Sequence, residues 1–216
     1  MKKISIGILG VGVVAAAITG SLVFLNKDKA SSPPQSENSV KEDKPKPQPP
    51  PDPKKHSYMD TDFARKMIVY NQQATELANL VQHGGSDSDV LALAKEITET
   101  HGRTADKYAN WLKEWGETYQ NLSDFPQTDG HDAYPTFTGL AAAYELQKMT
   151  EMSKAELEKE FVRLILQHHE GALEHIKNMG GDNLQYGEMK EFVKTDTEHY
   201  TKEVKSITDL KNAKGY

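Results

Sequence analysis

The sequence contains no cysteine among its 216 residues. This absence excludes disulfide bonds, thiolate metal sites, cysteine nucleophiles and a lipid anchor on cysteine. An excess of basic residues is missing too, since the formal net charge is −6 and the acidic excess lies after residue 57. An acidic domain repels phosphate backbones, so we expect no nucleic acid partner.

Several catalytic motifs are absent as well. The zinc-protease motif needs a second histidine four residues after the first, but the histidine that follows His169-Glu170 is His175. No glutamate stands three residues before a histidine, so the ligand pairs of ferritin-type di-iron enzymes are missing. Phosphate-binding loops, dinucleotide fingerprints and nucleophile elbows are also absent. The sequence therefore favours a protein that is not an enzyme, and a metal-dependent enzyme of ferritin-like type is the weakest hypothesis.

The N-terminal part is expected to lie outside any packed core. An uncharged stretch of 22 residues, Ile4 to Leu25, follows two lysines. It is long enough to cross a bilayer and long for a cleaved signal peptide. We predict an uncleaved signal anchor over residues 1–25, with cleavage and secretion as the alternative; both place the remainder outside the cytoplasm. Residues 26–57 contain eight prolines among charged residues and are predicted to be a disordered linker.

The remainder, residues 58–216, is predicted to be an all-α domain built from a duplicated helix hairpin. No segment alternates apolar and polar residues over strand length, whereas helical spacing fills repeats at about 58–116 and 153–212, offset by 98 residues. Two hairpins with one apolar face each are expected to pack as a four-helix bundle. Between them, residues 124–135 are predicted to form a loop and residues 140–149 a short helix.

Helix boundaries follow from stop and cap residues. Gly84-Gly85 and Gly180-Gly181 are expected to end the first helix of each repeat. Ser153 with Glu156 has the spacing of a capping box. Ser86 or Ser88 is expected to cap the second helix.

Histidine is the residue type that indicates a function. His168 and His175 are seven residues apart, about two helical turns, and share the predicted apolar stripe, while His169 lies at its edge. Imidazoles that face a bundle interior lose solvation unless a partner satisfies them. A transition metal is one such partner. A backbone carbonyl or a neighbouring carboxylate is the other, and the residues alone leave both open.

Further ligands are predicted on neighbouring helices. Asp196 and His199 are three residues apart on the last helix and are expected to face His168. His101 lies near the corresponding place on the second helix. Met67 offers a thioether, which would favour copper, although a methionine in a helical stripe is more often a core residue.

This pattern resembles the domain of unknown function 305 family. The resemblance spans residues 58–211 and rests on Phe161–Ala172 with its His168-His169-Glu170-Gly171-Ala172, on Gly139-Leu140 and Glu145-Leu146, and on Met59–Ala78 with its Gln72-Gln73-Ala74. It implies a ferritin-like bundle outside the cytoplasm that binds copper or another transition metal through histidine and methionine, with a role in metal tolerance or storage.

The resemblance also shows a departure. His168 and His169 match the second of two His-His pairs, whereas Tyr70 and Asn71 replace the first. Ile165 stands where a methionine is expected, although Met67 keeps its counterpart. Tyrosine and asparagine are poor ligands for copper or zinc, so half of the imidazole ligands that the family implies are replaced.

Two hypotheses follow. The first is a membrane-tethered, extracytoplasmic metal-binding protein, with copper favoured. The second is a structural or protein-interaction module of the cell envelope with a degenerate metal site, which the Tyr70-Asn71 replacement favours. The predicted metal ligands are His168, His169, His175, His199, Asp196, His101 and Met67.

Overall fold

The computed structural model describes residues 54–124 and 137–216, and every regular element within these ranges is helical. The all-α prediction is therefore confirmed for this part of the chain. The elements are α1 Tyr58–Gly84, α2 Ser88–Glu114, α3 Ala143–Met149, α4 Lys154–Met179 and α5 Gly187–Lys214, with two short 3-10 turns at Leu122–Asp124 and Gly181–Asn183.

Some predictions lie outside the described residues. These are the signal anchor at 1–25, the linker at 26–57 up to residue 53, and the loop at 124–135 after its first residue. Among the helices that the structure does describe, none combines the length and apolar character needed to cross a bilayer.

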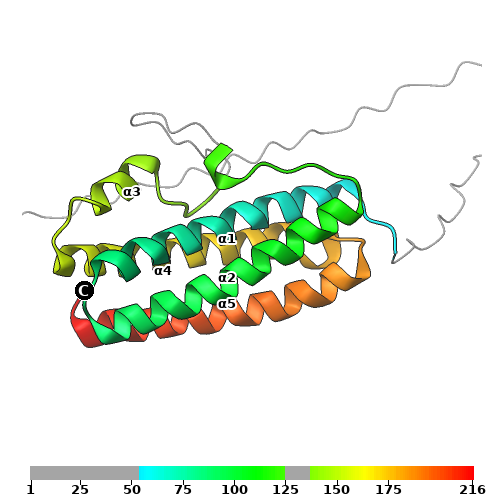
Figure 1. Ribbon diagram of the computed structural model, residues 1–216. Helices are drawn as coiled ribbons and strands as arrows, with labels where there is room; N and C mark the ends of the chain where they lie inside the picture. Colours follow the sequence, from blue (N-terminus) through cyan, green and yellow to red (C-terminus); the bar gives the residue numbers. More distant parts are fainter. Residues whose placement is uncertain (1–53, 125–136) are drawn as a thin grey trace, which may run out of the picture. The chain divides into compact units, whose positions relative to one another are not determined.

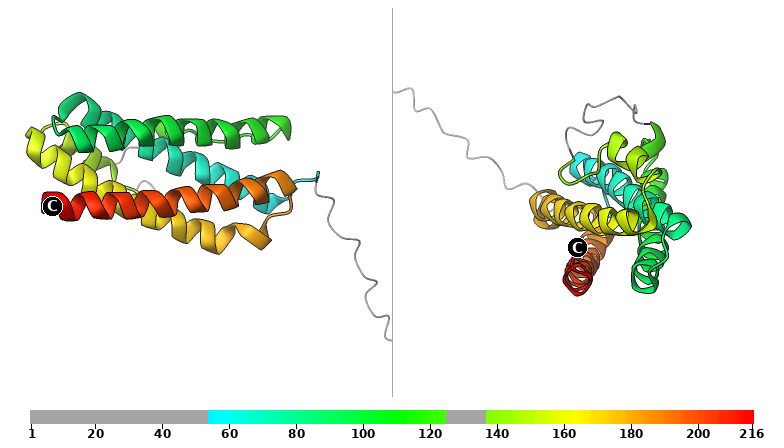
Figure 2. Two further views of the ribbon diagram at one scale, coloured as in Figure 1. Left: turned by 90° about the horizontal axis from the view of Figure 1, so that it is seen from below. Right: turned by 90° about the vertical axis from the view of Figure 1, so that its left-hand side faces the viewer.

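The four long helices pack as two antiparallel hairpins, α1 with α2 and α4 with α5 (Figure 1). Helix α1 also packs against α4, and α2 against α5. Helix α2 ends at the end of the bundle where α5 begins, and α4 begins at the opposite end (Figures 1 and 2). The connection that carries the short helix α3 therefore runs along the length of the bundle.

The helix ends agree with most of the predicted signals. Helices α1 and α4 end before Gly85 and Gly180, and the predicted Ser153–Glu156 capping box is present at α4. The predicted cap at α2 is wrong. Asp87 takes that position, and its carboxylate accepts from the backbone N–H groups of Asp89 and Val90. A carboxylate between the two serines is the stronger acceptor at a positive helix N-terminus.

Each hairpin also caps a helix of the other hairpin. Buried Asp60 on α1 accepts from the backbone N–H groups of Gln185 and Tyr186 at the start of α5. Buried Glu158 on α4 accepts from those of Ser86 and Asp87 at the start of α2. These contacts satisfy helix N-terminal donors that would otherwise lack partners inside the protein.

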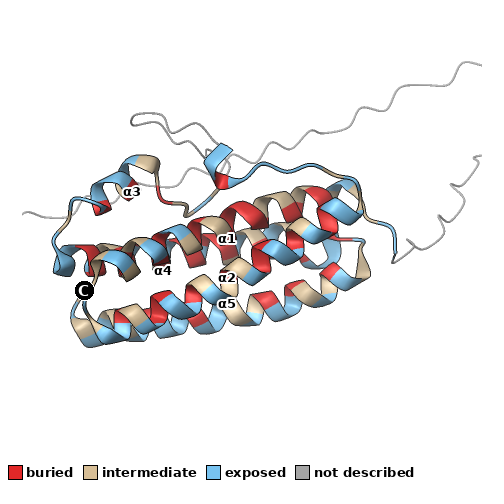
Figure 3. Cartoon of the chain, in the orientation of Figure 1, coloured by how far each residue is buried: buried red, intermediate tan, exposed pale blue. Residues whose placement is uncertain are grey.

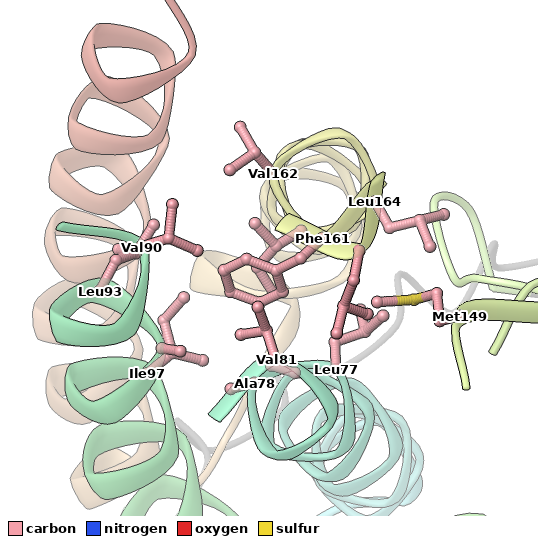
Figure 4. Close-up of a cluster of buried hydrophobic side chains, with 14 of the residues drawn as sticks. Leu77, Ala78, Val81, Val90, Leu93, Ile97, Met149, Phe161, Val162 and Leu164 are labelled. Carbon is pink, nitrogen blue, oxygen red and sulfur yellow. The ribbon is translucent and has the colours of Figure 1, made fainter. Parts of the chain in front are cut away.

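The buried residues of the four long helices face the inside of the bundle (Figure 3). Most of the apolar ones form two large clusters. Figure 4 shows the first cluster, where Phe161 packs among side chains of α1, α2 and α4. The second cluster includes Phe63, Met67 and Tyr108. The first cluster uses residues 74–81, 90–97, 157–165 and Ile207, and the second uses 63–70, 108–112, 172–176 and 189–200. The gap between these ranges falls near the middle of every long helix.

A segment before α3, residues 137–142, which we call the strap, lies on α1 and α4. The Tyr70 hydroxyl donates to Thr138 O at 2.9 Å. The side-chain amide of Gln73 accepts from Ala141 N at 2.7 Å and donates to Ala141 O at 2.9 Å. Because Ala141 is held in this way, the short helix begins at Ala143 and not at the predicted residue 140.

Candidate metal centre

Five of the buried polar residues between the two apolar clusters contact one another in a chain, and we call them the polar layer. Asn71 comes from α1, His101 from α2, His168 and His169 from α4, and Glu203 from α5. None is more than 4% exposed, so water cannot satisfy their side chains. Their partners within the layer therefore decide its stability and its chemistry.

The Glu203 carboxylate is the centre of the layer. Its Oε2 lies 3.0 Å from His101 Nε2 and 3.2 Å from His169 Nε2. His199, one helical turn earlier on α5 and half-buried, places its Nε2 3.6 Å from Oε1. Among the described residues, His101, His169 and Glu203 form the one group of three side chains whose ligand atoms all lie within 4.8 Å of one another.

The charge of this group follows from the opposing effects on Glu203. Burial raises the pKa of Glu203, but the adjacent imidazoles of His101 and His169 lower it more, and the net pKa lies well below the usual range of a glutamate. Burial lowers the pKa of His169, which its contact with Glu203 only partly offsets. Glu203 is therefore a buried carboxylate anion, and His169 favours the neutral form.

The hydrogen positions on His101 are fixed by Asn71. Asn71 Nδ2 donates to Met67 O at 2.7 Å, which turns Asn71 Oδ1 towards His101 Nδ1 at a distance of 2.7 Å. An amide oxygen only accepts, so His101 Nδ1 carries a hydrogen. His101 Nε2 then faces an ionised carboxylate. Either His101 also carries a hydrogen on Nε2, or a metal cation lies between Nε2 and the Glu203 carboxylate.

Two atoms of the group have no hydrogen-bond partner among the described residues, His169 Nε2 and Glu203 Oε1. A buried acceptor without a partner is unfavourable by about 1–3 kcal/mol. Neutral imidazole nitrogens and a carboxylate oxygen are ligands for zinc, copper(II) and iron(II). In a tetrahedral zinc site such ligands lie about 3.3 Å apart, which is close to the separations seen here. The residues present fit a divalent transition metal.

The structure separates the other predicted ligands. His168 is fully buried, but its Nε2 bonds Tyr70 O at 2.9 Å and its Nδ1 faces His169 Nδ1 at 3.3 Å. His175 stacks on Phe63 with ring centroids 5.5 Å apart, and burial lowers its pKa to about 4. His175 contributes to the second apolar cluster and not to the polar layer.

Asp196 and Met67 also have other partners. Asp196 accepts from the Tyr108 hydroxyl at 3.0 Å, and burial raises its pKa to about 6. Met67 is fully buried in the second apolar cluster. Two details of the predicted arrangement are wrong, since His169 is buried rather than at the edge of the stripe, and the ring of His199 stacks at 6.4 Å on that of His101 rather than facing His168.

Sequence reasoning missed Glu203. Two of the apolar residues on the last helix, Phe192 and Val204, are only half-buried in the structure, so apolar residues alone do not define its inner face. The buried residues of α5 are Met189, Val193, Asp196, Tyr200, Glu203 and Ile207. Their spacing of three and four residues passes through two acids, and acidic residues within a core stripe are the signal that identifies the site.

Comparisons with known proteins agree with this architecture. The model of the family described as Domain of unknown function (DUF305) matches residues 60–211. A DUF305 fragment from Deinococcus radiodurans has a TM-score of 0.62 at 18% identity, over 75% of this chain and 97% of that one. A DUF305 protein from Streptomyces coelicolor, described as secreted, has a TM-score of 0.59 at 23% identity, over 73% and 92%. These likenesses concern the fold alone. No curated protein matches the chain.

Proposed function

The chain belongs to the DUF305 family, and from this premise we propose that it binds one divalent transition metal ion in the middle of the bundle. The ligands are His101, His169 and Glu203, with His199 as the fourth. The single crossover between α2 and α4 is the connectivity of ferritin-like bundles, and we infer that fold class for the chain.

One observation carries the proposal. Two imidazole nitrogens from different helices lie 3.0 and 3.2 Å from the same ionised carboxylate oxygen in a buried layer. Neutral imidazoles cannot compensate the charge of Glu203, because His101 already donates its Nδ1 hydrogen to Asn71. A divalent cation would bind the two imidazole nitrogens and the carboxylate oxygen at once, and its charge would neutralise the buried anion.

The donor set bears on the identity of the metal. Two nitrogens and a carboxylate oxygen suit zinc, copper(II) or iron(II), whereas copper(I) prefers thioether or thiolate sulfur. Met67 packs in the second apolar cluster, so the predicted thioether contribution to a copper site has no support from the geometry. We therefore propose copper as copper(II), in competition with zinc, and not as copper(I).

Calorimetric titration of the purified protein with zinc, copper(II) and copper(I) tests the proposal. We expect one saturable site for zinc or copper(II) and weak binding of copper(I). Affinity should fall as the pH is lowered, because protons compete for the imidazole and carboxylate donors. The variant His169→Leu should lose the site, and the matched variant His175→Leu on the same helix should keep it. Equal binding by both variants would exclude the assigned ligands.

A buried ion pair is the competing interpretation of the same geometry. If His101 carries hydrogens on both nitrogens, it satisfies Asn71 and Glu203 without a metal. The chain would then be a structural or interaction module of the cell envelope. A protein that binds none of the three ions and melts at the same temperature with and without chelator would favour this function.

The wider role is also a proposal. Four protein ligands would leave no open coordination position, which is typical of structural and not catalytic metal sites, so we propose binding without catalysis. The apolar stretch at 4–25 and the description of the Streptomyces relative as secreted support a domain tethered outside the cytoplasm. Protease treatment of intact cells should therefore remove the domain.

A further inference from the structure

Two chains of hydrogen bonds run from α1 into the polar layer, and each ends at a proposed ligand. The first begins at Met67 O, which accepts from Asn71 Nδ2; Asn71 Oδ1 then accepts from His101 Nδ1. Both distances are 2.7 Å. Because the backbone carbonyl can only accept, every donor in this chain has a fixed direction. The nitrogen left for Glu203 and the metal is His101 Nε2.

The second chain begins one turn further along α1. Tyr70 O accepts from His168 Nε2 at 2.9 Å, so the hydrogen of neutral His168 is on Nε2 and its Nδ1 is an acceptor. His169 Nδ1 lies 3.3 Å from that acceptor, and His169 also bonds the backbone of Ile165 one turn earlier. Both partners accept, so Nδ1 of His169 carries the hydrogen. The nitrogen left free on His169 is again Nε2, the atom 3.2 Å from Glu203 Oε2.

We propose that Asn71 and His168 are positioning residues that fix Nε2 as the metal-binding nitrogen of His101 and His169. This inference rests on the proposed metal site. It changes the roles that the family resemblance implies at the second histidine pair and at Tyr70-Asn71, which replaces the first. His168 is not a ligand, although it stands in the double-histidine motif. Asn71 is not a lost ligand, since its amide orients the imidazole of His101. Partners of this kind typically change metal affinity by 10–100-fold when they are removed.

The alternative arrangement would make His168 a ligand through Nδ1. That nitrogen points at His169 Nδ1, and the opposite nitrogen of the same ring is held by the backbone of α1. Ring rotation would break the bond to Tyr70 O and leave the Nε2 hydrogen of His168 without an acceptor in a fully buried position, which is unfavourable. The geometry therefore separates the adjacent histidines into one ligand and one support.

Nitrogen NMR of the full chain with labelled histidine tests the inference without any metal or variant. At alkaline pH, with chelator present, we expect a hydrogen on Nδ1 of both His101 and His169 and on Nε2 of His168; any second hydrogen of His101 should be on the Nε2 that faces Glu203. The opposite tautomer at His101 or His169 would overturn the inference. Because the readout needs no metal, it stands apart from the titration that tests the proposed site.

Variants of the full chain give a second test, read by copper(II) electron paramagnetic resonance and by titration. His168→Leu should weaken zinc binding by about 10–100-fold while the number of nitrogens coordinated to copper(II) stays at the wild-type value. His169→Leu should lose saturable binding. Asn71→Leu should weaken binding to a similar extent as His168→Leu. A nitrogen lost in His168→Leu, or an unchanged affinity in Asn71→Leu, would contradict the assignment.

Discussion

Residues 98 positions apart in the two hairpins make the same contacts at the ends of the bundle and different contacts in its middle. At the ends, Asp60 on α1 caps the start of α5, and Glu158 on α4 caps the start of α2. Both carboxylates are buried and both accept from two consecutive backbone N–H groups. The duplicated sequence therefore keeps one way of joining the hairpins.

In the middle, three equivalent pairs have diverged: Asn71 with His169, Gln73 with Gly171, and Ala105 with Glu203. The second hairpin supplies the carboxylate and two imidazoles of the proposed site. The first supplies Asn71 and the carbonyls that orient the imidazoles. Three of the four proposed ligands therefore come from the second hairpin, and both chains of hydrogen bonds that orient them begin on α1 of the first; we call this the division of labour between the repeats.

The largest expected effect comes from making the second repeat resemble the first at the centre. Glu203→Ala copies Ala105 and removes the only carboxylate of the group. The three imidazoles that remain, His101, His169 and His199, bind a divalent ion less tightly than a site with an anionic ligand, so we expect the affinity for zinc to fall sharply. Titration measures the loss, and Glu198→Ala, at an exposed position on the same helix, is the matched control. Wild-type affinity in Glu203→Ala would show that the site lies elsewhere.

The next effect concerns Gln73 and Gly171, which contact the strap in different ways. Gln73 binds Ala141 through both amide atoms, whereas Gly171 leaves room for the strap, because a Cβ there would overlap the carbonyl of Thr138. Gly171→Ala should lower the free energy of unfolding by about 3 kcal/mol, as overpacking does. Urea denaturation measures the change. At Gly102 on α2 a Cβ meets nothing within 4 Å, so Gly102→Ala should stabilise by about 0.5–1 kcal/mol.

Gly171 and Glu203 show which parts of the fold and of the site the sequence could not predict. The helices, their glycine stops and the Ser153–Glu156 cap follow from residues close in sequence, and His101 and His169 were among the predicted metal ligands. The contact of Gly171 with the strap joins segments that no local pattern connects. Glu203 was missed because charged residues are usually solvated, and only tertiary packing shows that its stripe faces inward.

A smaller effect is expected at Asp196, whose equivalent in the first repeat is the neutral Thr98. Burial raises the pKa of Asp196 from 3.8 to about 6. The contribution of this carboxyl to stability is therefore complete below about pH 4 and is lost as the pH rises through about 6. Asp196→Asn, which does not ionise, should stabilise the metal-free protein by about 2 kcal/mol at pH 8 and change little at pH 4. Thermal unfolding at both pH values measures this, and equal shifts would contradict it.

The smallest effect tests the likeness of the ends. Asp60→Asn and Glu158→Gln each weaken the bonds to two backbone N–H groups at a helix start, and each should lower the free energy of unfolding by about 1–2 kcal/mol. Asp60 also accepts from Ser57 N and Oγ in the capping box of α1, so the loss in Asp60→Asn should be the larger. The two losses should add in the double variant, since the sites lie at different joins. Neither substitution should alter the affinity for zinc. A loss of metal binding in one variant alone would mean that the ends share in the division of labour seen in the middle.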